Sequence, residues 1–162
     1  MKIHYMAAAQ TDIGLVKQVN QDSLIVKVVD TELGEVTLAV LCDGMGGLTK
    51  GELASAIVVR VFEAWFMEKL PYQLRNLTAE MLKAEWERLV TDCNDRIRKQ
   101  GHQNMGTTLT AMLFYADAYY IIHVGDCRAY ELTSEVFQLT KDQTFVEREV
   151  ASGRMTREQA KT

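Results

Sequence analysis

Short runs of apolar and β-branched residues predict strands in the first quarter of the chain. Residues 3–9 are expected to form a first strand, and the Val-, Leu- and Ile-rich residues 23–29 and 36–42 predict two more. A polar stretch at 30–35 separates these two runs. We therefore expect a β-hairpin with a longer loop.

Two helices are predicted next. The first lies between residues 50 and 70, where apolar positions recur at helical intervals. A second helix is expected to start after Thr78, a favourable N-cap, and to end near Gly101. Lys99 lies in its last turn, where a cation complements the helix dipole. Its apolar face comprises Met81, Leu82, Trp86, Leu89, Val90, Cys93 and Ile97.

The rest of the chain returns mainly to strands. Short β-rich runs are predicted at 107–115, 118–124, 128–133 and 136–139. Residues 145–151 indicate a helix closed by Gly153, and Thr156 is expected to cap another. Strands followed by helices and then strands are typical of an α+β protein, and 162 residues predict one domain covering 1–162.

Composition narrows the function classes. The chain is 48% apolar and 25% charged, as in soluble globular proteins, and its net charge of −4 argues against a nucleic-acid partner. Cys42, Cys93 and Cys127 are odd in number and widely spaced, which favours buried free thiols over zinc ligands or disulfides. No run is apolar enough for a signal peptide or a membrane span, so we expect a cytoplasmic protein with no membrane partner.

A glycine-rich turn after the second hairpin strand is the main candidate for chemistry. Asp43 is followed by Gly44, Met45, Gly46 and Gly47. This spacing fits neither a Walker A loop nor a dinucleotide-binding fingerprint. A carboxylate beside exposed carbonyls suits Mg²⁺ or Mn²⁺, but a glycine-rich bend with a surface aspartate is an open alternative.

Other segments favour the metal site. They contain the runs Asn20-Gln21-Asp22, Met105-Gly106-Thr107-Thr108, Gly125-Asp126-Cys127-Arg128, Lys141-Asp142-Gln143-Thr144 and Gly153-Arg154-Met155-Thr156. In this order and spacing, and together with the Asp43 turn, they closely resemble bacterial type 2C serine/threonine protein phosphatases, which are metal-dependent. The resemblance extends from about Thr11 to the end of the chain.

The resemblance implies two antiparallel β-sheets packed as a sandwich flanked by helices. Two cations, Mn²⁺ or Mg²⁺, would lie at one edge of the sandwich, with a third and weaker site nearby. By position, Asp43 would contact both metals and the Gly44 carbonyl would be a ligand. Asp22 would hold metal-bound waters, and Asp126 would belong to the third site.

The implied reaction is hydrolysis of phosphoserine or phosphothreonine in proteins by a metal-activated water. No side chain is then expected to act as the nucleophile. The histidines, His4, His102 and His123, are expected to be structural or on the surface.

Several departures from the family pattern bear on activity. Lys17 stands where an arginine usually grips the substrate phosphate, Cys127 replaces a serine, and Met45 lies where animal members have a histidine general acid. No aspartate follows Asp142, whereas the family domain continues with two more metal-ligand aspartates. We therefore expect a domain incomplete at its C-terminus, with 141–162 as the flap beside the active site, and metals bound weakly or not at all.

Three hypotheses remain open at this stage. The first is an active phosphatase that acts on phosphoproteins, with a serine/threonine kinase as a family-level partner. The second is a catalytically silent phosphatase-like module that acts in protein binding or self-association, and the third is a fragment of an enzyme. Uncovered sheet edges make a homodimer a further expectation.

Overall fold

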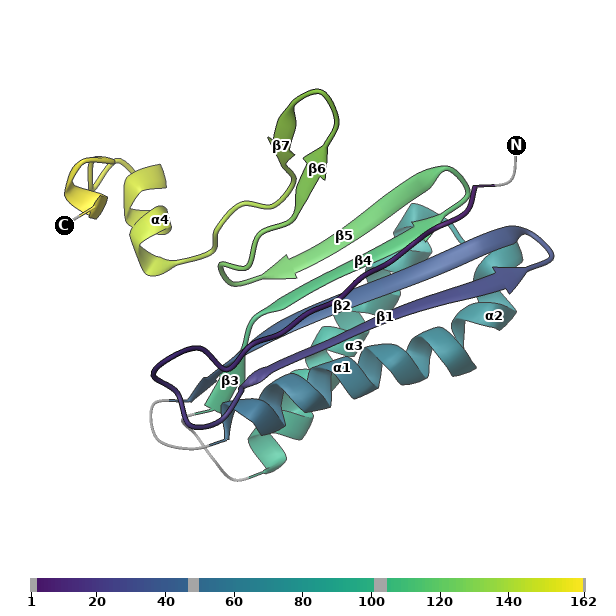
Figure 1. Cartoon of the computed structure of the whole chain (residues 1–162), viewed down its shortest axis with the longest axis horizontal. Helices are drawn as coiled ribbons and strands as arrows, with labels where there is room; N and C mark the ends of the chain where they lie inside the picture. Colours follow the sequence, from purple (N-terminus) through teal and green to yellow (C-terminus); the bar gives the residue numbers. More distant parts are fainter. Residues whose placement is uncertain (1–2, 47–49, 101–104, 162) are drawn as a thin grey trace.

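A computed structural model describes residues 3–46, 50–100 and 105–161 (Figure 1). Its main sheet is antiparallel, with the strand order β1-β2-β4-β5 and β3 paired to the end of β2. The strands are β1 (Asp22–Thr31), β2 (Gly34–Gly46), β3 (Met105–Thr107), β4 (Leu109–Tyr115) and β5 (Ala118–Val124).

The predicted hairpin is confirmed, but its expected longer loop is wrong. Residues 30–31 and 34–35 continue the two strands, and Thr31 pairs with Gly34 across a turn of Glu32 and Leu33. The Thr31 hydroxyl closes this turn, because it donates to Gly34 O and accepts from Leu33 N–H. The polar stretch at 30–35 thus predicted the position of the turn correctly, but the turn is shorter than this stretch.

Helices α1 (Gly51–Glu68) and α3 (Ala79–Lys99) lie on one side of the sheet (Figure 1). Both predicted helices are confirmed, and Thr78 Oγ1 caps α3 by accepting from Met81 N–H at 3.2 Å. Short α2 (Leu70–Gln73) and η1 (Leu74–Asn76) connect them. Gly101, the expected end of α3, lies outside the described residues.

The core lies between these helices and the sheet. Trp65, Phe62 and Trp86 pack together there, with Trp65 and Trp86 edge to face at a ring separation of 6.1 Å. The facing strands contribute the alternate residues Val36, Leu38, Val40 and Cys42 of β2 and Leu109, Ala111 and Leu113 of β4. The intervening residues of β2 and β4, including Asp43, therefore face away from the helices.

A second sheet is the small hairpin of β6 (Tyr130–Leu132) and β7 (Val136–Gln138). It projects from the main sheet and leads to α4 (Phe145–Ala151) and η2 (Gln159–Lys161) (Figure 1). The predicted α+β class with two antiparallel sheets and flanking helices is confirmed. Within the described residues, the second sheet is limited to this hairpin.

Some predicted boundaries were wrong. Residues 3–9 form no strand, because Tyr5 N–H donates to the Glu35 carboxylate rather than to a neighbouring strand. The strand expected at 107–115 is interrupted at Thr108, and the helix expected after Thr156 is only the 3₁₀ turn η2. No helix among the described residues is long and apolar enough to cross a membrane.

Candidate metal centre

Asp22 and Asp43 lie side by side at the end of the main sheet. The hairpin register pairs Asp22 of β1 with Asp43 of β2, so their side chains project from the same face. This is the face away from the helices, because the neighbouring Cys42 points into the core. The short hairpin turn therefore brings together two carboxylates that are 21 positions apart in the sequence.

The Asp43 carboxylate is partly buried and lies near other carboxylates. Partial burial raises its pKa above the usual aspartate range, and the neighbouring Asp22 carboxylate raises this pKa further. Lys17 acts in the opposite direction, while Asp126 adds a smaller repulsion. A divalent cation at this position would relieve the repulsion that the carboxylates exert on one another.

Two loops bring the other predicted residues to the same place. Asp126 lies in the turn after β5, close enough to act electrostatically on Asp43 and on the Cys127 thiol. Lys17 lies in the segment before β1, where its Nζ donates to Gln21 Oε1 at 3.2 Å. Asn20 supports this segment, since its side chain accepts from Asp22 N–H and donates to Thr11 Oγ1.

Gly44 is required by close packing. A Cβ on Gly44 would lie 2.3 Å from Gly51 O and 2.5 Å from Gln21 O, so the end of β2 touches the start of α1 through backbone atoms. Gly44 N–H donates to Gln21 O at 3.1 Å, and Ser55 Oγ donates to the same carbonyl. The glycine turn thus joins β1, β2 and α1. Gly46 ends β2, and Gly47 lies outside the described residues.

The donor set suits a hard cation in kind. Asp22, Asp43 and Asp126 offer carboxylate oxygens, the ligands that Mg²⁺ and Mn²⁺ prefer. Within residues 3–46, 50–100 and 105–161, however, no group of three or more His, Cys, Asp or Glu is arranged to hold a metal ion. These residues therefore fit part of a metal centre.

The two described histidines and the two buried cysteines are engaged or enclosed away from the candidate metal ligands. His123 is held by Thr110 Oγ1 and Gly125 O, and His4 contacts Glu35, while His102 lies outside the described residues. Burial raises the pKa of Cys42 and Cys93 to about 12, so both remain neutral thiols at neutral pH. The expectation of full burial was wrong for Cys127, which is partly exposed.

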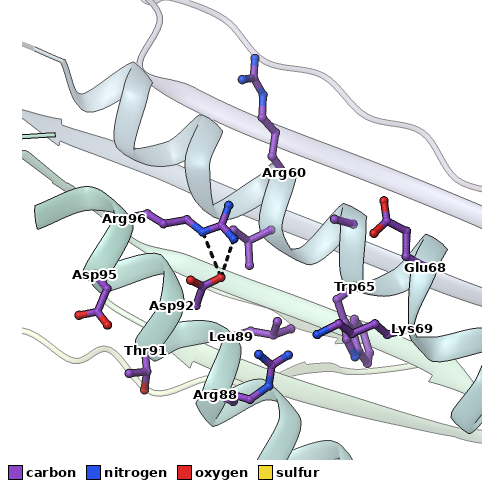
Figure 2. Close-up of a pocket in the computed structure, with 12 residues that line it drawn as sticks. Arg60, Trp65, Glu68, Lys69, Arg88, Leu89, Thr91, Asp92, Asp95 and Arg96 are labelled. Carbon is purple, nitrogen blue, oxygen red and sulfur yellow. Dashed lines mark hydrogen bonds and ion pairs between the residues drawn. The ribbon is translucent and has the colours of Figure 1, made fainter. Parts of the chain in front are cut away.

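A groove of about 640 Å³ lies elsewhere, between α1 and α3 (Figure 2). Its charges largely compensate one another. Arg96 binds Asp92 at 3.0 Å, and Arg88 binds Glu85 at 2.6 Å. It contains none of the candidate metal ligands.

Sequence reasoning missed the residues that hold the site together. Gln21 joins Gly44, Lys17 and Ser55, and Thr108 bonds to the backbone of Asp43. Both lie within the runs that carry the family resemblance, and that was the available signal. Their roles follow from contacts across strands, which the sequence does not display.

The protein phosphatase 2C family model matches residues 15–160. The serine/threonine protein phosphatase PstP of Mycobacterium tuberculosis is 36% identical over 159 residues, or 94% of this chain, and the Listeria innocua phosphatase Stp is 29% identical over 95% of it. The chain spans only 28% and 61% of these two relatives.

Solved structures agree with these matches. A serine/threonine phosphatase from S. agalactiae matches 94% of this chain with a TM-score of 0.78 and 28% identity. The PstP catalytic domain in complex with two manganese ions matches 94% of it with a TM-score of 0.69 and 36% identity. The chain covers 62% of each of these structures. The chain belongs to the protein phosphatase 2C family.

Proposed function

We propose that this chain is part of a metal-dependent phosphatase that hydrolyses phosphoserine and phosphothreonine in proteins. The observation that carries the proposal is the convergence of Asp22, Asp43, Asp126 and Lys17 at one end of the main sheet. Support comes from the family membership and from a relative solved with two manganese ions.

The metal-binding roles proposed from the sequence are retained. Asp43 and the Gly44 carbonyl would bind Mn²⁺ or Mg²⁺, Asp22 would orient water beside them, and Asp126 would serve a further metal site. When bound, such cations lower the pKa of a coordinated water and neutralise phosphate charge. Met45 is 56% exposed and its thioether cannot donate a proton, so the leaving group would be protonated by water or by another group.

Lys17 is proposed to bind the substrate phosphate. Its ammonium group lies near the aspartates, where it can attract a dianion that approaches the metals. A lysine lacks the two-pronged geometry of arginine, so it would attract the phosphate without fixing its orientation.

The extent of the domain, the substrates and the oligomeric state are also proposals. Residues 1–162 would belong to one phosphatase-like domain, with 141–162 as its flap. Substrates of a serine/threonine kinase are the proposed targets, and a cytoplasmic location stays a prediction. A homodimer would form through the outer strands β1 and β5, and light scattering that finds only monomers across concentrations would refute it.

Activity is tested with p-nitrophenyl phosphate and a phosphothreonine peptide, each with Mn²⁺ or with EDTA. We expect slow Mn²⁺-dependent turnover that falls at least about 100-fold in Asp43→Asn, since a lost metal ligand removes charge stabilisation in the transition state. Asp95→Asn is the matched control, because Asp95 is an exposed aspartate on α3 outside the candidate site.

Two results would overturn the proposal for this chain. Turnover that is equal in Asp43→Asn and the wild type would exclude this site. Absence of both turnover and calorimetric Mn²⁺ binding would favour the alternative of a silent protein-binding module.

A further inference from the structure

Thr108 lies between the two parts of the chain that carry the proposed metal ligands. It separates β3 from β4, and it is only 1% exposed. The register is the same on both sides, since Leu41 faces Thr110 in β4 and Gly44 faces Thr107 in β3. Thr108 therefore lies opposite Asp43.

The hydrogen bonds at this position differ from a regular ladder. In an antiparallel ladder, the two residues of a hydrogen-bonded pair each donate a backbone N–H to the backbone carbonyl of the other. Thr108 N–H does donate to Asp43 O at 2.9 Å, but Asp43 N–H donates to the Thr108 hydroxyl, also at 2.9 Å. The side chain has replaced its own carbonyl as the acceptor, which accounts for the interrupted strand.

The same side chain contacts the turn that carries Asp126. Thr108 Oγ1 lies 3.1 Å from Cys127 Sγ. A Cβ on Gly125 would lie 2.7 Å from Thr108 Cγ2, and Gly125 has a φ of +107°. Only glycine lets this turn approach the threonine so closely. One buried side chain thus touches both ligand-bearing segments.

We propose that Thr108 is a positioning residue that couples Asp43 to the turn at residues 125–127. Its hydroxyl fixes the Asp43 backbone, while its hydroxyl and methyl together hold the turn, so Asp43 and Asp126 keep a constant spacing. Cys127 acts as the hydrogen-bond partner of Thr108 in this contact. The consequence for metal binding rests on the proposed function, but the coupling itself needs no metal.

The first test is made without metal. Thr108→Val keeps the branched shape and removes the hydroxyl. Thr110→Val is the matched control, because Thr110 is also buried and its hydroxyl bonds to His123 at 2.9 Å and not to Asp43 or Cys127. In EDTA, amide exchange of Asp43 measured by NMR should be about five- to tenfold faster in Thr108→Val than in the control or the wild type. Equal rates in the two variants would overturn the proposal.

The second test is Mn²⁺ titration by calorimetry. Thr108→Val should weaken binding about tenfold or more, as loss of an outer partner of a metal ligand commonly does. Thr108→Ser, which keeps the hydroxyl, should restore most of the affinity. An equal loss in Thr110→Val, or no recovery with serine, would overturn the positioning role. A wild-type chain that shows neither Mn²⁺ binding nor turnover would refute the proposed function instead, and amide exchange would then test the contact between Thr108 and Asp43 alone.

Discussion

At the scale of single residues, repulsion between Asp22 and Asp43 lowers the stability of the metal-free chain, although both carboxylates belong to the proposed metal centre. The pKa of Asp43 is raised in the folded chain, chiefly by desolvation and then by Asp22. The folded state therefore binds this proton more tightly than the unfolded state does. The contribution of Asp43 to stability is present at pH values below the unfolded pKa of about 3.9 and is lost as the pH rises through the higher folded pKa.

We expect Asp43→Asn to stabilise the metal-free chain at pH 7 by about 1–4 °C in melting temperature, the scale of a partly solvated charge pair. The gain should shrink towards pH 4, because the raised pKa of Asp43 favours its protonation as the pH falls. Thermal melts in EDTA at both pH values measure this, with Asp95→Asn as the control. A lower melting temperature for Asp43→Asn at pH 7 would contradict the repulsion inferred for this pair.

At the scale of elements, Gly44 makes the contact between β2 and α1. Gly44→Ala would place a methyl group against the backbone oxygens of Gly51 and Gln21, and no side-chain rotation can relieve that clash. We expect a loss of about 2–3 kcal/mol in the free energy of unfolding, at the upper end of overpacking effects. Urea denaturation measures it.

Gly106→Ala is the matched control for this substitution. Gly106 lies in β3 opposite Met45, and its nearest atom to an added Cβ is the flexible Met45 Cε at 3.9 Å. It should change stability by less than about 0.5 kcal/mol. Similar losses in the two variants would mean that the region tolerates no methyl group anywhere, and the specific contact would be refuted.

The elements also show how far the sequence could predict this fold. Periodicity was sufficient for α1, α3 and the β1–β2 hairpin, because each buries one regular apolar face. It failed for residues 3–9, whose apolar character did not determine whether a partner strand lay beside them. Periodicity also could not predict the Asp22–Asp43 pairing. The strand register depends on a two-residue turn, and the composition suggested a longer one.

At the scale of the whole molecule, burial is unevenly distributed along the chain. The buried apolar core draws on residues 36–113, with partly buried neighbours up to Ile122. Beyond it, β6 and β7 are exposed along their whole length, and α4 has no buried residue. The C-terminal segment that begins at the Asp126 turn is therefore held to the main sheet mainly by polar contacts, including the hydrogen bond that Gln143 Nε2 donates to His123 O at 3.0 Å.

This distribution predicts a stability gradient. Local opening costs less where little apolar surface is buried, so amides of β2 and β4 should exchange roughly 100-fold or more slowly than those of β6, β7 and α4. Hydrogen exchange followed by mass spectrometry measures both regions in one experiment. Equal protection would mean that the C-terminal segment unfolds together with the core. The expected difference in exchange would instead mean that the chain has a stable part, which contains Asp43, and a C-terminal segment that opens independently. The turn at Asp126, which contacts Thr108, would be the boundary between them.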